Sequence, residues 1–381
     1  MNKKINIVYI IDYFHRTGGT ERHLAELVQS LARDRFACSV VVFDMGTSAL
    51  LQAMRHSGVR VIHIPVGREY VPNAFKRGLE LYRFIKSHKI DIVQTFHQKA
   101  DTYGALIAHF AGTRHIISSR RDTGELRRPW HHLLNRALRG LFENVIVVAE
   151  AVGGAIAASE GIDPARIVRI YNGVDVTKFA PPSAYDRARR RDTLGLDADD
   201  LVVGMVAGFR PEKNHAGFFQ AVRAAIDLVP HLKVVAVGAG PLLEQFRTIC
   251  AAPPLRSRVV FTGDVADVAP LLGVMDLGCL VPTANEGFSN AVLEKMATGL
   301  PLIVTNVGGN AEAVIHGENG LVIPPGDTRA LVDALVAVSR DPLTRSAMGR
   351  RSRQLIEERF SLSKMCSEHE ALYSALCERD P

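Results

Sequence analysis

Short runs of apolar, often β-branched residues alternate along the chain with segments whose apolar residues recur at helical spacing. The runs predict twelve strands, and segments such as 21–32 and 218–229 predict helices between them. Alternating strands and helices favour right-handed βαβ crossovers and parallel sheets covered on both faces. Because twelve strands exceed one eight-stranded barrel, we expect an α/β protein with two doubly wound sheets of six strands each. The expected strands are 5–11, 39–43, 59–64, 90–95, 115–118, 144–148, 202–207, 233–237, 259–261, 277–280, 302–305 and 321–323.

A break near residue 173 divides this alternation. The turn sequence Asn-Gly-Val-Asp at 172–175 is followed by the pair Pro181–Pro182 and by a polar, arginine-rich stretch at 187–200. We therefore expect a Rossmann-like domain at 1–172 and a second one at 173–360. The apolar spacing in residues 361–381 predicts a final helix, which we expect to pack back on the first domain.

Composition narrows the class of protein. The chain has 381 residues, of which 47% are hydrophobic and 23% charged, as in soluble globular proteins rather than disordered ones. Its five cysteines are scattered without a CxxC pair, which argues against a disulfide framework or a cysteine zinc site and favours a cytoplasmic location. The first apolar run, 5–11, is too short to cross a bilayer, and Asp12 ends it without a signal-peptide cleavage site.

The charge is uneven between the two halves of the chain. Residues 1–180 hold 25 basic and 16 acidic side chains, a net +9, whereas the remainder carries −3. A basic first half indicates an anionic partner, such as a phosphorylated substrate, a membrane surface or nucleic acid, or else only a soluble basic surface. Nucleic acid is not expected, because no recognition motif or aromatic platform accompanies the charge.

The window 282–301 carries the most informative chemistry. It follows an apolar run, so it lies at the carboxyl end of a strand, where doubly wound sheets bind ligands. Ser289 or Asn290 is a suitable N-cap for the helix that follows, and the amides of 288–290 predict an anion site. Glu286 and Glu294 bracket that site and could accept hydrogen bonds from sugar hydroxyls. The alternative is a surface turn with two solvated glutamates.

Three other strand ends carry candidate chemistry. Arg210 and Lys213 follow the seventh expected strand and could neutralise a diphosphate. Gly18 and Gly19 follow the first and would let a phosphate or sugar approach closely. His97 follows the fourth and could bind sugar hydroxyls. Each feature alone also fits an ordinary loop or a structural histidine.

Two other kinds of site are not supported. The segment Val237–Pro241 resembles a dinucleotide fingerprint, but Leu243 stands at the third glycine position and Pro241 removes a backbone donor. The triplet Asp197–Asp199 precedes the seventh strand and so lies at the wrong end for a metal at the phosphate loop. We therefore expect no metal site and no cofactor.

Taken together, these motifs resemble the retaining glycosyltransferases of family four, which have the GT-B fold of two Rossmann-like domains facing across a cleft. The resemblance covers nearly the whole chain, and its parts follow the order of the family. Glu286 and Glu294 correspond to the family's E-x7-E signature. The motifs are the glycine pair 18–19, His97, NGVD at 172–175, GFRPEKN at 208–214, VGAGP at 237–241, FTGDV at 261–265 and EGFSNAVLEKMATGLP at 286–301.

The resemblance implies a nucleotide-sugar donor, with a UDP-sugar favoured, held mainly by the second domain. Arg210 and Lys213 would hold the diphosphate and stabilise the charge that develops as it leaves. Glu294 would bind the ribose hydroxyls and Glu286 the sugar. The nucleotide sugar is then a substrate, and neither a cofactor nor a metal is implied. The other implied donor contacts are Gly18, Gly19, Gly263, Val265, Gly287, Phe288, Ser289 and Asn290.

The resemblance also implies the reaction. His97 would contact the sugar at the reacting centre, and the configuration of the anomeric carbon would be retained by front-face attack. The expected function is transfer of a sugar to a glycan or lipid-linked acceptor in polysaccharide or lipopolysaccharide biosynthesis. A sugar-nucleotide epimerase of the same architecture is the alternative.

The acceptor side is expected in the first domain. Arg120 and Arg121 follow the fifth expected strand and could border an acceptor site. They belong to the segment 114–139, which holds seven arginines and two acidic residues, and whose helix around 133–141 carries an apolar stripe expected to pack in the core. This charge predicts peripheral attachment to the anionic inner face of the cytoplasmic membrane.

Overall fold

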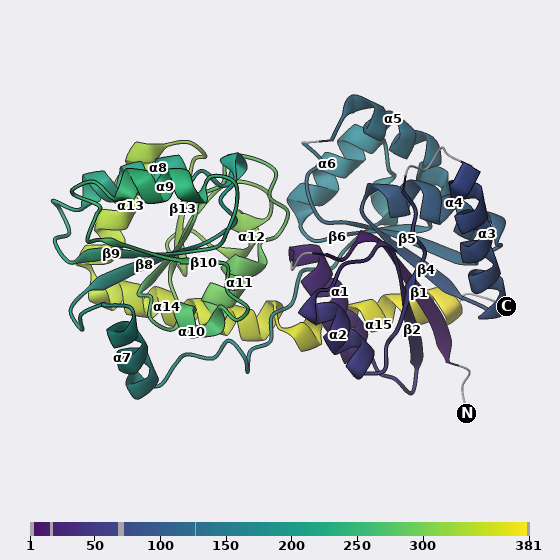
Figure 1. Cartoon of the computed structure of the whole chain (residues 1–381), viewed down its shortest axis with the longest axis horizontal. Coiled ribbons are helices and arrows are strands. Elements are labelled where there is room, and N and C mark those ends of the chain that lie inside the picture. Colours follow the sequence, from purple (N-terminus) through teal and green to yellow (C-terminus); the bar gives the residue numbers. More distant parts are fainter. Residues whose placement is uncertain (1–3, 16–17, 68–71, 126, 379–381) are drawn as a thin grey trace. The chain divides into compact units, whose positions relative to one another are not determined.

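The computed structural model describes residues 4–15, 18–67, 72–125 and 127–378 and divides the chain into two compact units (Figure 1). Unit 1 comprises Met1–Asn172 together with Leu362–Pro381, and unit 2 comprises Gly173–Ser361. The chain therefore passes from unit 1 into unit 2 once and returns at its last helix.

Unit 1 is built on a parallel seven-stranded sheet in the order β3-β2-β1-β4-β5-β6-β7. The central strands are largely buried, as expected for a sheet covered on both faces, and they include buried polar residues such as Gln94 and Thr95. Strand β7 was not expected from the sequence, because it has only three residues. The strands are β1 Ile5–Tyr13, β2 Phe36–Asp44, β3 Arg60–His63, β4 Ile92–Phe96, β5 His115–Arg120, β6 Asn144–Val147 and β7 Ile167–Arg169.

The helices of unit 1 cover both faces of this sheet (Figure 1). A π-helical turn at Ala100–Gly104 leads from β4 into the fourth helix. The helices are α1 Gly19–Ser30, α2 Ala49–His56, α3 Pro72–Ser87, α4 Ala105–Phe110, α5 Pro129–Leu138, α6 Glu150–Glu160 and α15 Leu362–Glu378.

Unit 2 repeats the architecture with a parallel six-stranded sheet in the order β10-β9-β8-β11-β12-β13. Its strands are β8 Leu201–Val206, β9 Leu232–Val237, β10 Val259–Gly263, β11 Leu277–Leu280, β12 Leu302–Thr305 and β13 Gly320–Ile323. Its helices are α7 Ala184–Thr193, α8 His215–Ala225, α9 Leu243–Cys250, α10 Ala269–Leu272, α11 Asn290–Ala297, α12 Asn310–Ala313, α13 Thr328–Arg340 and α14 Pro342–Arg359. The doubly wound α/β prediction is thus confirmed in both units.

Each sheet reverses its strand order at one point. In unit 1 the reversal lies between β1 and β4, and in unit 2 between β8 and β11. Doubly wound sheets bind ligands beyond the carboxyl ends of the strands at such a switch point, because the loops diverge there and leave room. The strand order therefore marks one candidate position in each unit.

The predicted apolar stripe on the helix around 133–141 is not part of a core. In α5 the side chain of Asn135 is buried, whereas Leu133 is 72% exposed and Trp130 is 50% exposed. Helical spacing identified an amphipathic helix correctly but could not tell which face the rest of the fold would cover. Among the described residues, no helix is long and apolar enough to cross a bilayer.

The last helix, α15, completes the core of unit 1. Its residues Met365, Tyr373 and Leu376 are buried in the same apolar cluster as strand β1. The Tyr9 hydroxyl donates to the Tyr373 hydroxyl at 3.3 Å, and Tyr373 donates to Oε1 of Gln94 at 2.5 Å. These two hydrogen bonds give three buried polar side chains partners inside the core.

Two buried histidines lie where α15 meets α1. The rings of His23 and His369 are 5.7 Å apart, and both residues are nearly inaccessible to solvent. His369 Nδ1 faces the carbonyl of Met365 at 3.0 Å, whereas His369 Nε2 and His23 Nδ1 have no hydrogen-bond partner. Burial lowers the pKa of His369 to about 4 and places that of His23 well below its ordinary value. The native state therefore holds both rings neutral.

This pair predicts that unit 1 loses stability as the pH falls from about 6.5 toward 4. In that window His369 is protonated in the unfolded state but stays neutral in the native state. The free energy of unfolding therefore falls by up to about 1.4 kcal/mol per pH unit for this group. His369→Leu should flatten the slope, and the exposed variant His109→Leu should keep it. Urea unfolding followed by the fluorescence of Trp130 measures both. Equal slopes in wild type and His369→Leu would refute the assignment.

Candidate functional site

In unit 2 the loops that follow β8 and β11 meet at the switch point. The amide of Thr283, after β11, donates to the carbonyl of Glu212, after β8, at 2.9 Å. This backbone bond fixes the two loops side by side. It brings the two candidate motifs, 208–214 and 286–301, to the same edge of the sheet.

The two loops are also joined by an ion pair. Lys213 Nζ lies 2.6 Å from Glu286 Oε2, and the two side chains are 22% and 11% exposed. A pair this poorly hydrated is stronger than a surface salt bridge, but each partner depends on the other to offset its lost hydration. Arg210 lies exposed in the same loop. The structure thus brings Lys213 and Glu286 together, with Arg210 three residues before Lys213 in the same loop.

Local sequence explains why the loop after β8 holds Lys213 in place. Pro211 begins a short 3-10 turn that ends at Lys213, and proline is favoured at this first position. Asn214 then adopts a left-handed backbone with φ of 56°, which asparagine tolerates. Its side-chain oxygen accepts the amide of Gly217 at 3.1 Å and caps α8.

The loop after β11 leads directly into α11. Ser289 occupies the N-cap position, as expected, although its side chain makes no capping hydrogen bond. Glu294, one turn into the helix, is only 5% exposed, and Glu286 is 8% exposed. Neither glutamate of the predicted pair is a solvated surface residue, so the alternative of a surface turn with two solvated glutamates is wrong.

Gly308, after β12, explains how this loop is supported from behind. Its φ is +56°, and a Cβ there would collide with the carbonyl of Glu286. The next amide, that of Gly309, donates to the carbonyl of Gly287 at 2.6 Å. The absence of a side chain at 308 therefore lets the loop after β12 hold the 286–287 turn.

Sequence reasoning missed Lys295, which lies on α11 next to Glu294. It is fully buried, and its Nζ donates to the carbonyl of Cys279 at 3.2 Å. Burial lowers its pKa to about 8, partly opposed by the nearby Glu294 and Glu286. A lysine on the apolar face of a short helix was the available signal in the sequence.

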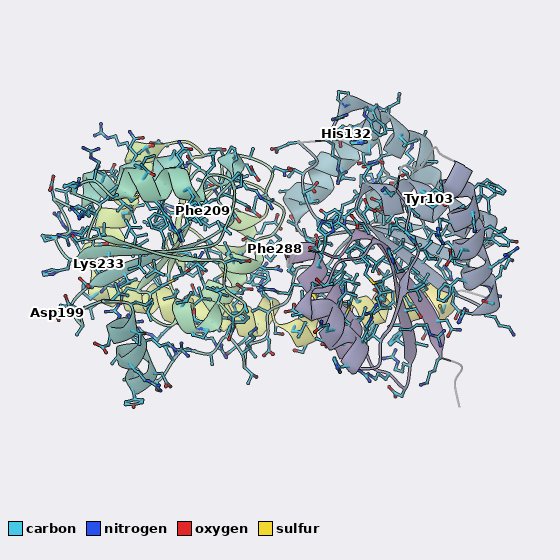
Figure 2. All side chains as sticks on the ribbon, in the orientation of Figure 1. Tyr103, His132, Asp199, Phe209, Lys233 and Phe288 are labelled. Carbon is cyan, nitrogen blue, oxygen red and sulfur yellow. The ribbon has the colours of Figure 1, made fainter. Side chains whose placement is uncertain are left out.

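His215 was also missed. It begins α8, directly behind the Lys213 loop, and its ring stacks on that of Phe209 with centroids 4.0 Å apart. Burial lowers its pKa to about 4, with Lys213 contributing in the same direction. The neutral ring of His215 and the ring of Phe209, which Figure 2 labels, are both buried next to the loop that holds Lys213.

The remaining donor-side candidates occupy the expected edge. Gly263 ends β10 with φ of +70°, and Val265 follows it half-buried. The acidic triplet 197–199 precedes β8, and Figure 2 labels Asp199 and Phe288 on opposite sides of unit 2. Among the residues that the structure describes, no cluster of three His, Cys, Asp or Glu could hold a metal ion.

In unit 1 the glycine pair begins α1. Gly18 is the N-cap, with no side chain of its own to cap the helix, and a Cβ there would strike the carboxylate of Glu21. Glu21 is 3% exposed, and burial raises its pKa, opposed by hydrogen bonds from its own amide and that of Gly18. The glycine therefore lets an acidic side chain fold back over the helix start.

His97 directly follows β4 in a backbone conformation that is uncommon for a residue other than glycine. Its φ is 74°, and its ring stacks on Tyr13 with centroids 4.5 Å apart and planes 11° apart. Nδ1 is buried without a hydrogen-bond partner, and burial lowers the pKa of the ring to about 4. At neutral pH the imidazole is therefore uncharged and can donate to or accept from a hydroxyl.

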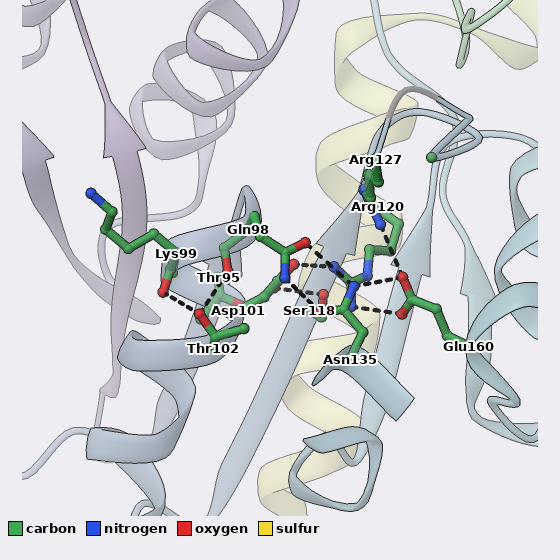
Figure 3. Close-up of polar contacts among 12 residues, drawn as sticks. Thr95, Gln98, Lys99, Asp101, Thr102, Ser118, Arg120, Arg127, Asn135 and Glu160 are labelled. Carbon is green, nitrogen blue, oxygen red and sulfur yellow. Dashed lines mark hydrogen bonds and ion pairs between the residues drawn. The ribbon is translucent and has the colours of Figure 1, made fainter. Parts of the chain in front are cut away.

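Arg120 does not fit the acceptor contact that the sequence suggested. Its side chain is 1% exposed and forms ion pairs with Asp101 and, at 2.9 Å, with Glu160 (Figure 3). Asp101 also accepts from Thr95 and Ser118, at 2.6 and 2.8 Å. Arg120 thus joins β5 to the turn after β4 and to α6, which is a structural role.

Arg121 is placed differently. Its Nη2 donates to Oδ1 of Asn172 at 2.7 Å, and burial lowers its pKa to about 10, opposed mainly by the charge of Glu21. The guanidinium therefore lies near the start of α1. Its role as an acceptor contact stays a prediction.

Comparison with known proteins agrees with this geometry. Residues 17–178 match the family model described as Glycosyltransferase Family 4, and residues 200–341 match the model described as Glycosyl transferases group 1. A UDP-Gal:alpha-D-GlcNAc-diphosphoundecaprenol alpha-1,3-galactosyltransferase of Escherichia coli is 26% identical over 98% of this chain and 97% of its own. A GDP-mannose-dependent phosphatidylinositol monomannoside mannosyltransferase of Mycolicibacterium smegmatis is 27% identical over 89% and 90%.

Solved structures share the fold. HepE of Anabaena in complex with UDP and glucose superposes with a TM-score of 0.87 at 22% identity, covering 97% of this chain and 100% of that one. WaaG, a glycosyltransferase of lipopolysaccharide biosynthesis, gives a TM-score of 0.73 at 15% identity, covering 97% and 99%. The named relatives transfer a sugar to an acceptor, so the epimerase alternative has no support. The chain therefore belongs to glycosyltransferase family 4 and is a glycosyltransferase with the GT-B fold.

Proposed function

We propose that this glycosyltransferase moves a sugar, with retention at the anomeric carbon, from a UDP-sugar to a glycan or lipid-linked saccharide of a cell-surface polysaccharide or lipopolysaccharide. The observation that carries the proposal is the Lys213–Glu286 pair at the switch point of unit 2, beside the start of α11. Relatives whose names specify UDP-Gal and a diphosphoundecaprenol acceptor, and structural neighbours bound to UDP, support the donor and acceptor classes.

Each candidate residue of unit 2 has a proposed role in donor binding. Arg210 and Lys213 hold the diphosphate, and Glu294 accepts hydrogen bonds from the ribose hydroxyls. Glu286 accepts from the sugar, and the backbone of 287–290 contacts sugar and phosphate. Gly263 and Val265 flank the base. The cations lie where a divalent ion would otherwise neutralise the leaving group, so the proposal includes no metal.

The chemical step needs positioning and charge stabilisation more than a protein nucleophile. The bond between the anomeric carbon and the phosphate oxygen breaks, and the acceptor oxygen forms a new bond on the same face. The acceptor proton goes to the leaving phosphate, so the nucleoside diphosphate departs with the charge that Arg210 and Lys213 stabilise. His97, uncharged at neutral pH, hydrogen-bonds a substrate hydroxyl.

The basic side of unit 1 suits an acceptor at a membrane surface. Helix α5 exposes Leu133, and Arg128, Arg136 and Arg139 are exposed in and beside it. Apolar and cationic side chains together favour reversible attachment to an anionic leaflet, at roughly 1 kcal/mol for each cation near the surface. We propose peripheral attachment of this kind at the cytoplasmic membrane.

A panel of UDP-, GDP- and ADP-sugars tests the donor class. The expected result is a rise in melting temperature with UDP-sugars, followed by transfer from the best donor to a lipid-linked saccharide in the presence of EDTA. Product analysis by NMR should show the anomeric configuration of the donor. Stabilisation by GDP- or ADP-sugars alone would refute the UDP assignment, and activity lost in EDTA but restored by magnesium would refute metal independence.

The Lys213–Glu286 pair predicts a catalytic loss larger than its structural cost. Lys213→Met and Glu286→Gln should each lower kcat about 10²–10³-fold, because a preorganised charge at the leaving group or sugar is removed. Each variant should keep a cooperative melt. Glu244→Gln, which breaks the exposed pair with Arg247 in the same unit, is the control and should change neither quantity. Loss of the cooperative melt in the test variants would make the pair structural instead.

Membrane attachment predicts co-sedimentation with anionic but not neutral vesicles at low salt. Replacing Arg128, Arg136 and Arg139 with Gln should abolish binding to anionic vesicles, and salt should release the wild type as it screens the charges. Arg127 is left unchanged, because it pairs with the buried Glu160 at 2.9 Å.

The matched control replaces three exposed arginines of unit 2, Arg189, Arg190 and Arg329, and should leave vesicle binding intact. Equal binding of the wild type to both vesicle types, or to neither, would contradict the membrane proposal without touching the donor assignment.

A further inference from the structure

Unit 1 contains a cavity of about 150 Å³ at its own switch point. Asp12 comes from the end of β1, and Gln98 and Lys99 come directly after β4, the neighbouring strand. Thr102 lies one turn further on, and Trp130 closes the cavity from α5. The volume would hold about five water molecules, which suits one sugar ring rather than a longer chain.

The polar groups of the cavity favour a neutral ligand. Asp12 accepts the amides of Lys99 and Ala100 at 2.8 and 2.6 Å, and a carboxylate has about four acceptor sites, so capacity remains for hydroxyl donors. The Lys99 ammonium donates to the carbonyls of Val66 and Gly67 at 3.0 and 2.7 Å. His131 and Leu134 are the other described residues that line the cavity, and no arginine is among them. A carboxylate, an amide and a hydroxyl without an uncommitted cation match sugar hydroxyls better than phosphate.

The aromatic wall is held in place from inside the fold. Gln98 Nε2 donates to Oδ1 of Asn135 at 2.7 Å, and Asn135 Nδ2 donates to Oε1 of Glu160, also at 2.7 Å. Arg120 and Arg127 complete this network (Figure 3). Asn135 is the one buried residue of α5, so these bonds anchor a helix that otherwise lies largely exposed. The same bonds therefore hold the helix that carries Trp130, which lines the cavity together with Gln98.

We propose that this cavity is the acceptor subsite, which binds one neutral sugar ring of the acceptor with its apolar face on Trp130 and its hydroxyls on Asp12, Gln98 and Thr102. The inference rests on the proposed transferase function and deepens it. A half-exposed indole beside hydrogen-bonding side chains matches a pyranose, which has an apolar C–H face and a polar rim.

Two further observations support the assignment. Burial raises the pKa of Asp12 to about 7, against the two backbone hydrogen bonds that lower it, so near neutral pH this carboxyl group is partly protonated and can both donate to and accept from a sugar hydroxyl. The cavity also adjoins His97 along both strands, because Gln98 follows His97 and Tyr13, which follows Asp12, stacks on its ring. The cavity therefore lies beside the two segments that hold His97, although His97 is not itself a lining residue.

The sole tryptophan of the chain makes occupancy directly measurable. The probes are short-chain alkyl diphosphates that each carry one α-linked sugar, which is N-acetylglucosamine, glucose, galactose or mannose. The same alkyl diphosphate without a sugar is the control compound. At least one sugar-bearing probe should change Trp130 fluorescence saturably, whereas the plain diphosphate should not. Equal responses to both kinds of probe, or no response to any of the four sugars, would overturn the proposal.

Kinetics with the probe that binds best separate binding from folding. Trp130→Ala should raise the KM for the acceptor about tenfold or more, with the affinity for UDP and the melt unchanged, and Trp130→Phe should restore most of the loss. Phe110→Ala, at an exposed aromatic position of unit 1 outside the cavity, is the control. An acceptor KM that Trp130→Ala changes less than threefold, or no more than the control does, would refute the subsite. Failure of the wild type to bind any nucleotide would instead refute the proposed function.

Discussion

The ion pair between Lys213 and Glu286 is the interaction on which the account of unit 2 depends. It joins two loops at the point where the strand order reverses, and both partners are largely withdrawn from water. Such a pair is costly to break by removing one member, but a charged ligand can replace either partner. In the proposed reaction the diphosphate takes the place of Glu286 beside Lys213, and Glu286 becomes available to the sugar. One contact thus preorganises the donor site in the absence of the donor.

Buried ion pairs also shape unit 1, but there they have a structural role. Arg120 is enclosed by Asp101 and Glu160, and these carboxylates are themselves bonded to neighbouring strands and helices. These ion pairs hold α5 and the turn after β4 in place, so the charges are not available to bind a substrate. What they position is the wall of a small polar cavity. In our proposal, buried charge in unit 2 acts directly on the donor, whereas buried charge in unit 1 supports the residues that bind the acceptor.

Much of the fold and of the donor site was predictable from local sequence patterns. Alternating strands and helices fix a parallel sheet, and the carboxyl ends of its strands then gather Lys213 and Glu286 at one edge. The burial of Arg120 was not predictable, because it depends on partners 19 and 40 residues away. Strand β7 was too short to produce a periodic signal, and helical spacing could not show that α5 leaves Leu133 exposed and Leu134 and Leu138 only half-buried.

Hydrogen–deuterium exchange in the presence of UDP tests the central claim most directly, because it locates the nucleotide without relying on turnover. The account predicts slower exchange of backbone amides in two segments of unit 2, the loop 207–214 and the start of α11 at 287–292. Residues 129–138 of α5 should exchange at an unchanged rate. Protection confined to unit 1, or saturating UDP without protection in either segment of unit 2, would contradict the account.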